Sequence, residues 1–139
     1  MKFILSMIAA FCGALWLAHP QDQDAETDGP WRQRAALAYA QGAYVEAKAL
    51  YEKALTQDLP EPDARWVRFR VADSGMRAAR GARSLDSDPL DQAIEELTAF
   101  GDLAIPEDAR DFVWAAAQES LGDHHWHLGY PLDAAAAWR

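Results

Sequence analysis

The stretch WRQRAALAYAQGAYVEAKALYEKALTQDL, residues 31–59, decides the fold of this chain. Apolar residues recur at helical spacing on both sides of Gly42, and a glycine at that point permits a tight turn. Ala35 and Ala47 are small where two antiparallel helices would cross most closely. The stretch therefore predicts a pair of antiparallel helices joined by a short turn.

The rest of the chain continues this helical pattern between glycine and proline residues that break it. No stretch shows sustained alternation of period two, so strands are not expected. We expect an all-α protein with one domain of about six helices. Their predicted bounds are residues 31–41, 44–57, 63–80, 89–100, 106–128 and 131 to the end.

The pattern of the first helix pair returns twice. Aligned by their small residues, the pairs match Ala35 with Ala47, Ala72 with Ala93, and Gly122 with Ala134. The separations within the pairs are 12, 21 and 12 residues, which places nine extra residues of the middle pair in a loop over residues 80–88. Such repetition predicts helix pairs stacked on one another, about two and a half of them.

The first pair resembles the tetratricopeptide repeat. The residues at that family's signature spacing are Trp31, Ala35, Gly42, Tyr44, Ala47, Tyr51, Ala54, Leu55 and Pro60. Two positions depart from the pattern: Arg34 stands where the family has a large apolar residue, and Ala38 where it has an aromatic one, with Tyr39 one place later. The resemblance implies a short solenoid of antiparallel helix pairs over residues 31–139.

In tetratricopeptide proteins the first helices of successive pairs line a concave groove that binds a peptide or protein. Carried onto this chain, the resemblance nominates as groove residues Tyr39, Asp73, Met76, Arg77, Asp123, Trp126 and His127. The alternative is that Tyr39, Met76 and Trp126 belong to the core, because apolar residues at helical spacing usually pack against other helices. The expected function is that of a scaffold for a peptide or protein partner.

A second resemblance points to a larger protein. The segments RWVRFRVADS (residues 65–74) and WAAAQESLGD (residues 114–123) are similar to the N-terminal helical region of exported bacterial alpha-2-macroglobulin-like proteins. The third pair also stops at Arg139 within its second helix, so we expect residues 31–139 to be C-terminally incomplete. The alternative function is therefore a structural N-terminal spacer without a ligand of its own. The thioester and bait region of that family are absent, so protease trapping is not implied.

The first thirty residues are expected to be an export segment and a linker. Residues 1–20 contain Lys2 and a long uncharged apolar run, as a signal peptide does, with cleavage after Ala14 or Ala18. An uncleaved N-terminal anchor is the alternative, and it is the only contact with a membrane that we expect. Residues 21–30 form an acidic linker. The protein is expected in the periplasm or secreted, and Cys12, its one cysteine, lies in the export segment.

Charge argues against nucleic acid as a partner. The chain has 13 Lys and Arg against 22 Asp and Glu, a net charge of −9, which repels a phosphate backbone. Its basic residues gather at Arg65, Arg68, Arg70, Arg77, Arg80 and Arg83. We expect these arginines to pair with nearby acids along solvated helix faces.

No motif predicts catalysis. His124, His125 and His127 are the one cluster with metal-ligand character, but zinc would need a further ligand, and imidazoles also suit a helix C-terminus. Asp73 and Asp123 occupy equivalent positions in stacked repeats, so we expect polar contacts on a shared face from them. With no phosphate-binding loop and no nucleophile motif, we expect no enzyme activity, no cofactor and no metal.

Overall fold

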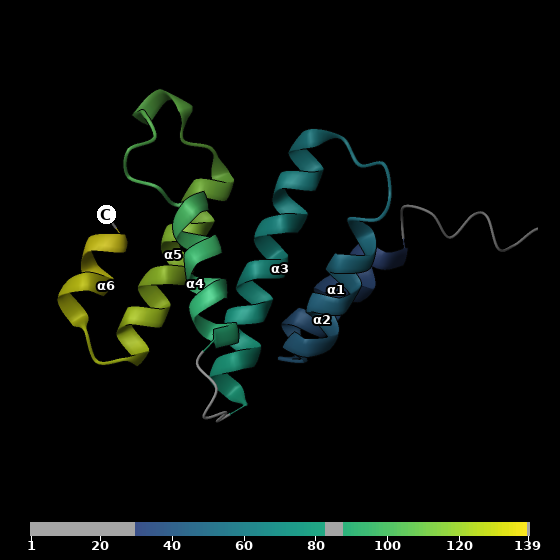
Figure 1. Cartoon of the computed structure of the whole chain (residues 1–139), viewed down its shortest axis with the longest axis horizontal. Helices are drawn as coiled ribbons and strands as arrows, with labels where there is room; N and C mark the ends of the chain where they lie inside the picture. Colours follow the sequence, from purple (N-terminus) through teal and green to yellow (C-terminus); the bar gives the residue numbers. More distant parts are fainter. Residues whose placement is uncertain (1–29, 83–87, 139) are drawn as a thin grey trace, which may run out of the picture.

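The computed structural model describes residues 30–82 and 88–138. Several parts of the sequence lie outside these residues. They are the expected signal peptide with Cys12, nearly all of the acidic linker, Arg83 and most of the expected loop over residues 80–88. The described residues form six α-helices and one short 3-10 helix, without strands, as the sequence predicts (Figure 1). None of these helices has the length and apolar character needed to cross a membrane.

The helix bounds follow the expected ones closely. They are α1 (Pro30–Ala40), α2 (Tyr44–Ala54), α3 (Glu61–Gly81), α4 (Asp88–Phe100), α5 (Phe112–His127) and α6 (Pro131–Ala137), with the 3-10 helix Glu107–Ala109 before α5. One expected bound is wrong, because the helix predicted from residue 106 begins at Phe112. Asp111 has extended backbone angles and its carboxylate accepts a hydrogen bond from the Trp114 amide at 2.8 Å, which makes it the N-cap.

Each helix packs against the next one in the chain, and α3 also contacts α5. Along the longest axis of the molecule, α1 and α2 lie at one end and α6 at the other (Figure 1). The turn between α1 and α2 contains Gly42 at φ +76°, a backbone conformation that glycine adopts without strain. Helix α3 is the longest and packs against α2 on one side and α4 on the other.

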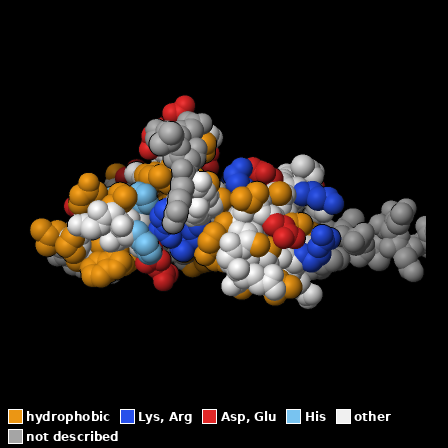
Figure 2. All heavy atoms as spheres, turned by 90° about the horizontal axis from the view of Figure 1, so that it is seen from below, with side chains coloured by type: hydrophobic (Ala, Val, Ile, Leu, Met, Phe, Trp, Pro, Cys, Tyr) orange, Lys and Arg blue, Asp and Glu red, His pale blue; other side chains and the backbone are white. Residues whose placement is uncertain are grey.

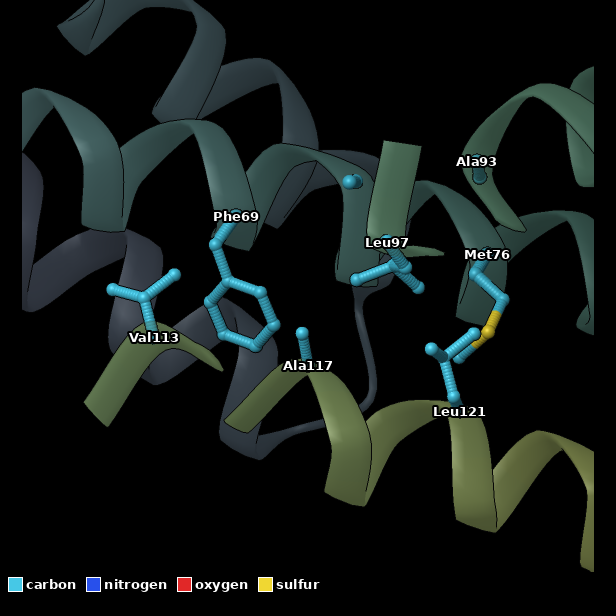
Figure 3. Packing of buried hydrophobic residues seen from close by; sticks show 8 residues of the cluster. Phe69, Met76, Ala93, Leu97, Val113, Ala117 and Leu121 are labelled. Atoms are coloured by element: carbon cyan, nitrogen blue, oxygen red, sulfur yellow. The ribbon is translucent and has the colours of Figure 1, made fainter. Parts of the chain in front are cut away.

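Two apolar clusters hold the helices together. The first joins α1, α2 and α3 through Trp31, Ala35, Ala38, Ala47, Tyr51, Ala54 and Val67. The second joins α3, α4 and α5 through Phe69, Ala72, Met76, Ala93, Leu97, Val113, Ala117 and Leu121 (Figure 3). Because both clusters include residues of α3, this helix connects the two halves of the protein.

The small residues that define the repeats are all buried. The six are Ala35, Ala47, Ala72, Ala93, Gly122 and Ala134. At Gly122 the reason is visible, since a Cβ atom there would lie 2.2 Å from Nε1 of Trp138. The burial predicted for Ala47 and Ala93 is thus confirmed, and the absence of a side chain at Gly122 lets the end of α6 pack on α5.

Candidate functional site

Among the described residues, one carboxylate is buried, and it lies on α3. Asp73 is only 1% exposed, yet donors from three helices reach it. The Tyr39 hydroxyl on α1 donates to Oδ2 at 2.5 Å, the Ser120 hydroxyl on α5 donates to Oδ1, and Arg77 Nε on α3 donates to Oδ1 at 2.9 Å. A buried carboxylate needs such partners to offset its lost hydration. Asp73 thereby ties α1, α3 and α5 together.

Two arginines flank this carboxylate. Arg70 Nη1 lies 3.5 Å from Asp73 Oδ2, and its guanidinium carbon lies 3.6 Å from the centre of the Tyr39 ring, a cation–π contact. Arg77 also reaches α5, where its Nη2 lies 3.5 Å from Asp123 Oδ2. Arg77 therefore bridges Asp73 and Asp123, which confirms the polar contacts that we expected from the two aspartates.

The predicted pairing of the arginines is right in part. Arg65 pairs with Asp111 and Arg68 with Glu61 on exposed faces, as expected. The side chains of Arg70 and Arg77 are only 16% and 19% exposed, so for them a solvated face was the wrong expectation. Their partner is buried instead, so its removal would leave two mostly buried charges uncompensated, a greater cost than the loss of a surface pair.

The Tyr39 hydroxyl is held in its neutral form. Burial raises the pKa of Tyr39 well above its ordinary value, and the charge of Asp73 and the hydrogen bond to it raise the pKa further. The phenol therefore remains a hydrogen-bond donor to Asp73 throughout the neutral range. This contact fixes the ring of Tyr39 next to the guanidinium of Arg70.

A pocket of about 220 Å³ opens beside these residues, and we call it the Asp73 pocket. Its lining comes from α1, α3 and α5: Tyr39, Trp66, Phe69, Arg70, Asp73, Arg77, Ala116, Glu119 and Ser120. Aromatic rings and guanidinium groups form much of the wall, and Glu119 is exposed. The pocket thus combines apolar surface with fixed charged groups.

Three of the seven nominated groove residues line this pocket, namely Tyr39, Asp73 and Arg77. Asp123 adjoins it through Arg77. Met76 does not, because it is completely buried in the second cluster, so its nomination as a groove residue is corrected and the alternative of a core residue holds. Met76 lies one position before Arg77, and on a helix neighbouring residues point about 100° apart.

The last two nominated residues lie at the end of α5, away from the pocket lining. Trp126 is exposed and its ring centre lies 6.0 Å from that of Trp138, so the alternative that it is a core residue is wrong. His127 is also exposed, and its Nδ1 lies 2.6 Å from the backbone oxygen of Asp123. Sequence reasoning missed the other six pocket residues, which are Trp66, Phe69, Arg70, Ala116, Glu119 and Ser120. The spacing of Trp66 and Arg70 with Asp73 and Arg77 on one helical face was the signal that could have found these two.

The histidines do not form a metal site within the described part of the chain, where no group of three suitable ligands comes together. His124 is buried with its Nδ1 unpartnered, and its ring centre lies 6.0 Å from that of His125. Histidine and basic side chains lie beside one another on the face shown in Figure 2. Burial lowers the pKa of His124, and the nearby charges of His125, Arg80 and His127 lower it further.

This lowered pKa predicts a loss of stability in mild acid. Below about pH 6.5 the unfolded chain binds a proton at this histidine more readily than the folded one, so the free energy of unfolding falls as the pH falls. Urea unfolding at pH 8 and pH 5 measures the effect. The substitution His124→Gln should make the difference between the two pH values smaller, whereas His127→Gln, which removes only one of the three nearby charges, should change it less. An identical pH dependence for wild type and His124→Gln would contradict the assignment.

No family model matches the chain, and neither does any curated protein or solved structure. Its class is therefore defined by the fold: over residues 30–82 and 88–138 it is an all-α protein of six helices packed against each other. The particular feature of this protein is the carboxylate of Asp73, which gathers aromatic and basic side chains from three of those helices around one pocket.

Proposed function

We propose that this protein is an exported scaffold of tetratricopeptide-like helix pairs that binds a peptide or protein segment at the Asp73 pocket. In this proposal α1 pairs with α2, α3 with α4 and α5 with α6, so that α1, α3 and α5 are the first helices of their pairs. The observation that carries the proposal is that the pocket is lined by residues of α1, α3 and α5 alone. In tetratricopeptide proteins, the groove along the first helices of the pairs binds the peptide or protein ligand.

The chemistry of the pocket suits protein recognition. The few residues that dominate the binding energy of protein interfaces are enriched in tryptophan, tyrosine and arginine, and Trp66, Tyr39 and Arg70 all line this pocket. Contacts to Asp73 and Tyr39 fix Arg70, and the hydrogen bond to Asp73 fixes Tyr39, before a partner arrives. The ring of Trp66 is held against Phe69 and Phe112. A surface that is already ordered loses less conformational entropy on binding.

The same contacts argue for binding rather than catalysis. The Ser120 hydroxyl donates a hydrogen bond to Asp73, and the carboxylate also accepts hydrogen bonds from Tyr39 and Arg77, so its oxygens are engaged. An activated serine would need a base such as histidine, and no histidine is among the residues that line the pocket. The arrangement therefore positions side chains instead of preparing a nucleophile.

Site-specific photocrosslinking in the producing cell tests this function. A photoreactive phenylalanine derivative replaces Glu119, exposed at the Asp73 pocket, and in the control it replaces Glu95, exposed on α4. We expect a discrete protein adduct in the exported fraction at Glu119 that disappears with Arg70→Gln, and no adduct at Glu95. Absence of an adduct at both positions would refute the scaffold and favour a structural spacer of a larger exported protein.

A further inference from the structure

The charges in the wall of the Asp73 pocket are balanced. Four of its lining residues are charged, two of each sign, and they are Arg70, Arg77, Asp73 and Glu119. Both arginines contact Asp73, whereas Glu119 is exposed and has no ion pair among the described residues. Because the formal charges of the lining sum to zero, the wall as a whole does not attract a ligand of either sign.

An acidic side chain of a partner is a poor occupant of this pocket. The side chains of Arg70 and Arg77 are mostly buried, and both lie against a carboxylate that is itself buried. Turning either guanidinium toward a ligand would take a partner from Asp73. A buried acceptor that loses a donor pays the full cost of its lost hydration. The arginines therefore serve Asp73 and are not available to a second carboxylate.

A basic side chain meets the opposite difficulty. It could pair with Glu119, but that carboxylate is exposed, and exposed ion pairs contribute little to binding. Inside the pocket, a further cation would lie near the like charges of Arg70 and Arg77. The second acid, Asp73, is only 1% exposed, and its oxygens already accept hydrogen bonds. The charges of the wall thus favour an uncharged occupant.

The uncharged part of the wall is aromatic. Trp66 and Phe69 on α3 and Tyr39 on α1 contribute their rings, and the ring centres of Trp66 and Phe69 lie 5.1 Å apart. The guanidinium carbon of Arg70 lies 5.3 Å from the centre of the Trp66 ring, in addition to its contact with Tyr39. Rings and guanidinium groups attract a further ring through its electron-rich face and its edge, beyond the burial of apolar area.

The pocket has room for one large side chain. Its volume of about 220 Å³ lies below the range of roughly 300–1,000 Å³ that is typical of sites for whole drug-sized ligands. Its walls are also held in place, since Tyr39 donates to Asp73 and the Trp66 ring packs against Phe69 and Phe112. The pocket therefore suits one residue of a longer segment.

We propose that the Asp73 pocket takes a phenylalanine, tyrosine or tryptophan side chain of the partner segment as its anchor. This inference rests on the function proposed above and specifies the chemistry of the partner. An aromatic anchor is uncharged, so the contacts of Asp73 stay intact, and its ring packs against Trp66 and the guanidinium of Arg70. It should bind about three- to tenfold more tightly than leucine at the same place.

Selection of peptides on the purified protein tests this proposal. Random peptides displayed on phage are selected on the full chain, and each selected peptide is then tested on two variants. Ala116→Phe fills the pocket from α5, and Ala115→Phe, the matched control, adds the same ring at the adjacent exposed position outside the lining. Circular dichroism verifies that both variants are folded. Arg70→Gln is a second pocket variant, which removes the guanidinium from the wall.

Peptides that bind wild type and Ala115→Phe but not Ala116→Phe are ligands of the pocket, and we expect them to share one aromatic residue. Isothermal titration calorimetry of synthetic peptides then measures its contribution. Replacing the aromatic residue with leucine should weaken binding about three- to tenfold, and Arg70→Gln should weaken it to a similar extent. Glu119→Gln should leave the dissociation constant within about twofold of wild type, because the anchor does not use this carboxylate.

Two kinds of result contradict the proposal, and they differ in what else they overturn. If the ligands of the pocket share an aliphatic or a charged residue, or if Glu119→Gln weakens them about tenfold, the aromatic anchor is refuted while binding at the pocket stands. If no selected peptide distinguishes Ala116→Phe from Ala115→Phe, and Arg70→Gln also binds every peptide as wild type does, the proposed function fails together with its anchor.

Discussion

Replacing Asp73 with alanine is expected to lower the free energy of unfolding by about 3–5 kcal/mol. The carboxylate is almost fully buried and accepts hydrogen bonds from Tyr39, Ser120 and Arg77. Its removal leaves the charges of Arg70 and Arg77 mostly buried without their shared partner. An uncompensated buried charge costs more than an ion pair contributes, so the loss should exceed that of any surface pair in this protein.

Urea unfolding of matched variants measures this effect. Asp123→Ala removes the other carboxylate that contacts Arg77, but its side chain is 39% exposed, so the loss should stay below about 1 kcal/mol. A variant that replaces Asp73 with leucine and both Arg70 and Arg77 with methionine should regain much of the stability, because no unpaired charge then remains. If Asp73→Ala and Asp123→Ala cost the same, Asp73 does not hold the three helices together.

The substitution Ala47→Trp is expected to cost about 3 kcal/mol of stability. Ala47 on α2 is fully buried among residues of α1 and α3, and it is small because the helices approach closely there. An indole ring cannot fit without moving a helix or forcing side chains from their preferred rotamers. The same substitution at Ala93 on α4 should have a comparable effect in the second cluster.

The control for this experiment lies two residues away on the same helix. Ala49 is exposed, so Ala49→Trp should change the free energy of unfolding by no more than about 0.5 kcal/mol. Thermal unfolding followed by circular dichroism compares the two variants directly. Equal stability of Ala47→Trp and Ala49→Trp would mean that the small residues do not mark the contacts between helices and that the repeat alignment is incorrect.

Much of the fold could be predicted because it depends on short-range patterns. Helical periodicity and the breaks at glycine and proline located six helices, with an error at the start of α5. That error arose because the N-cap role of Asp111 depends on its extended backbone, which spacing alone does not reveal. A third of the Asp73 pocket could be predicted in the same way, since three of its nine lining residues, Tyr39, Asp73 and Arg77, were placed by repeat position.

The sequence by itself determined which residues are helical and which small residues lie between helices, because both leave a regular spacing along the chain. Only the tertiary structure decided that Asp73 is buried, and that Met76 lies in the core while Arg77 beside it reaches the pocket. It also decided that Ser120, 47 residues from Asp73 along the chain, donates a hydrogen bond to the same carboxylate as Tyr39. Helical spacing gives the direction of a side chain around its own axis. It does not give the rotation of that axis against its neighbours, and this rotation decides whether a polar residue meets water or a partner from a distant helix.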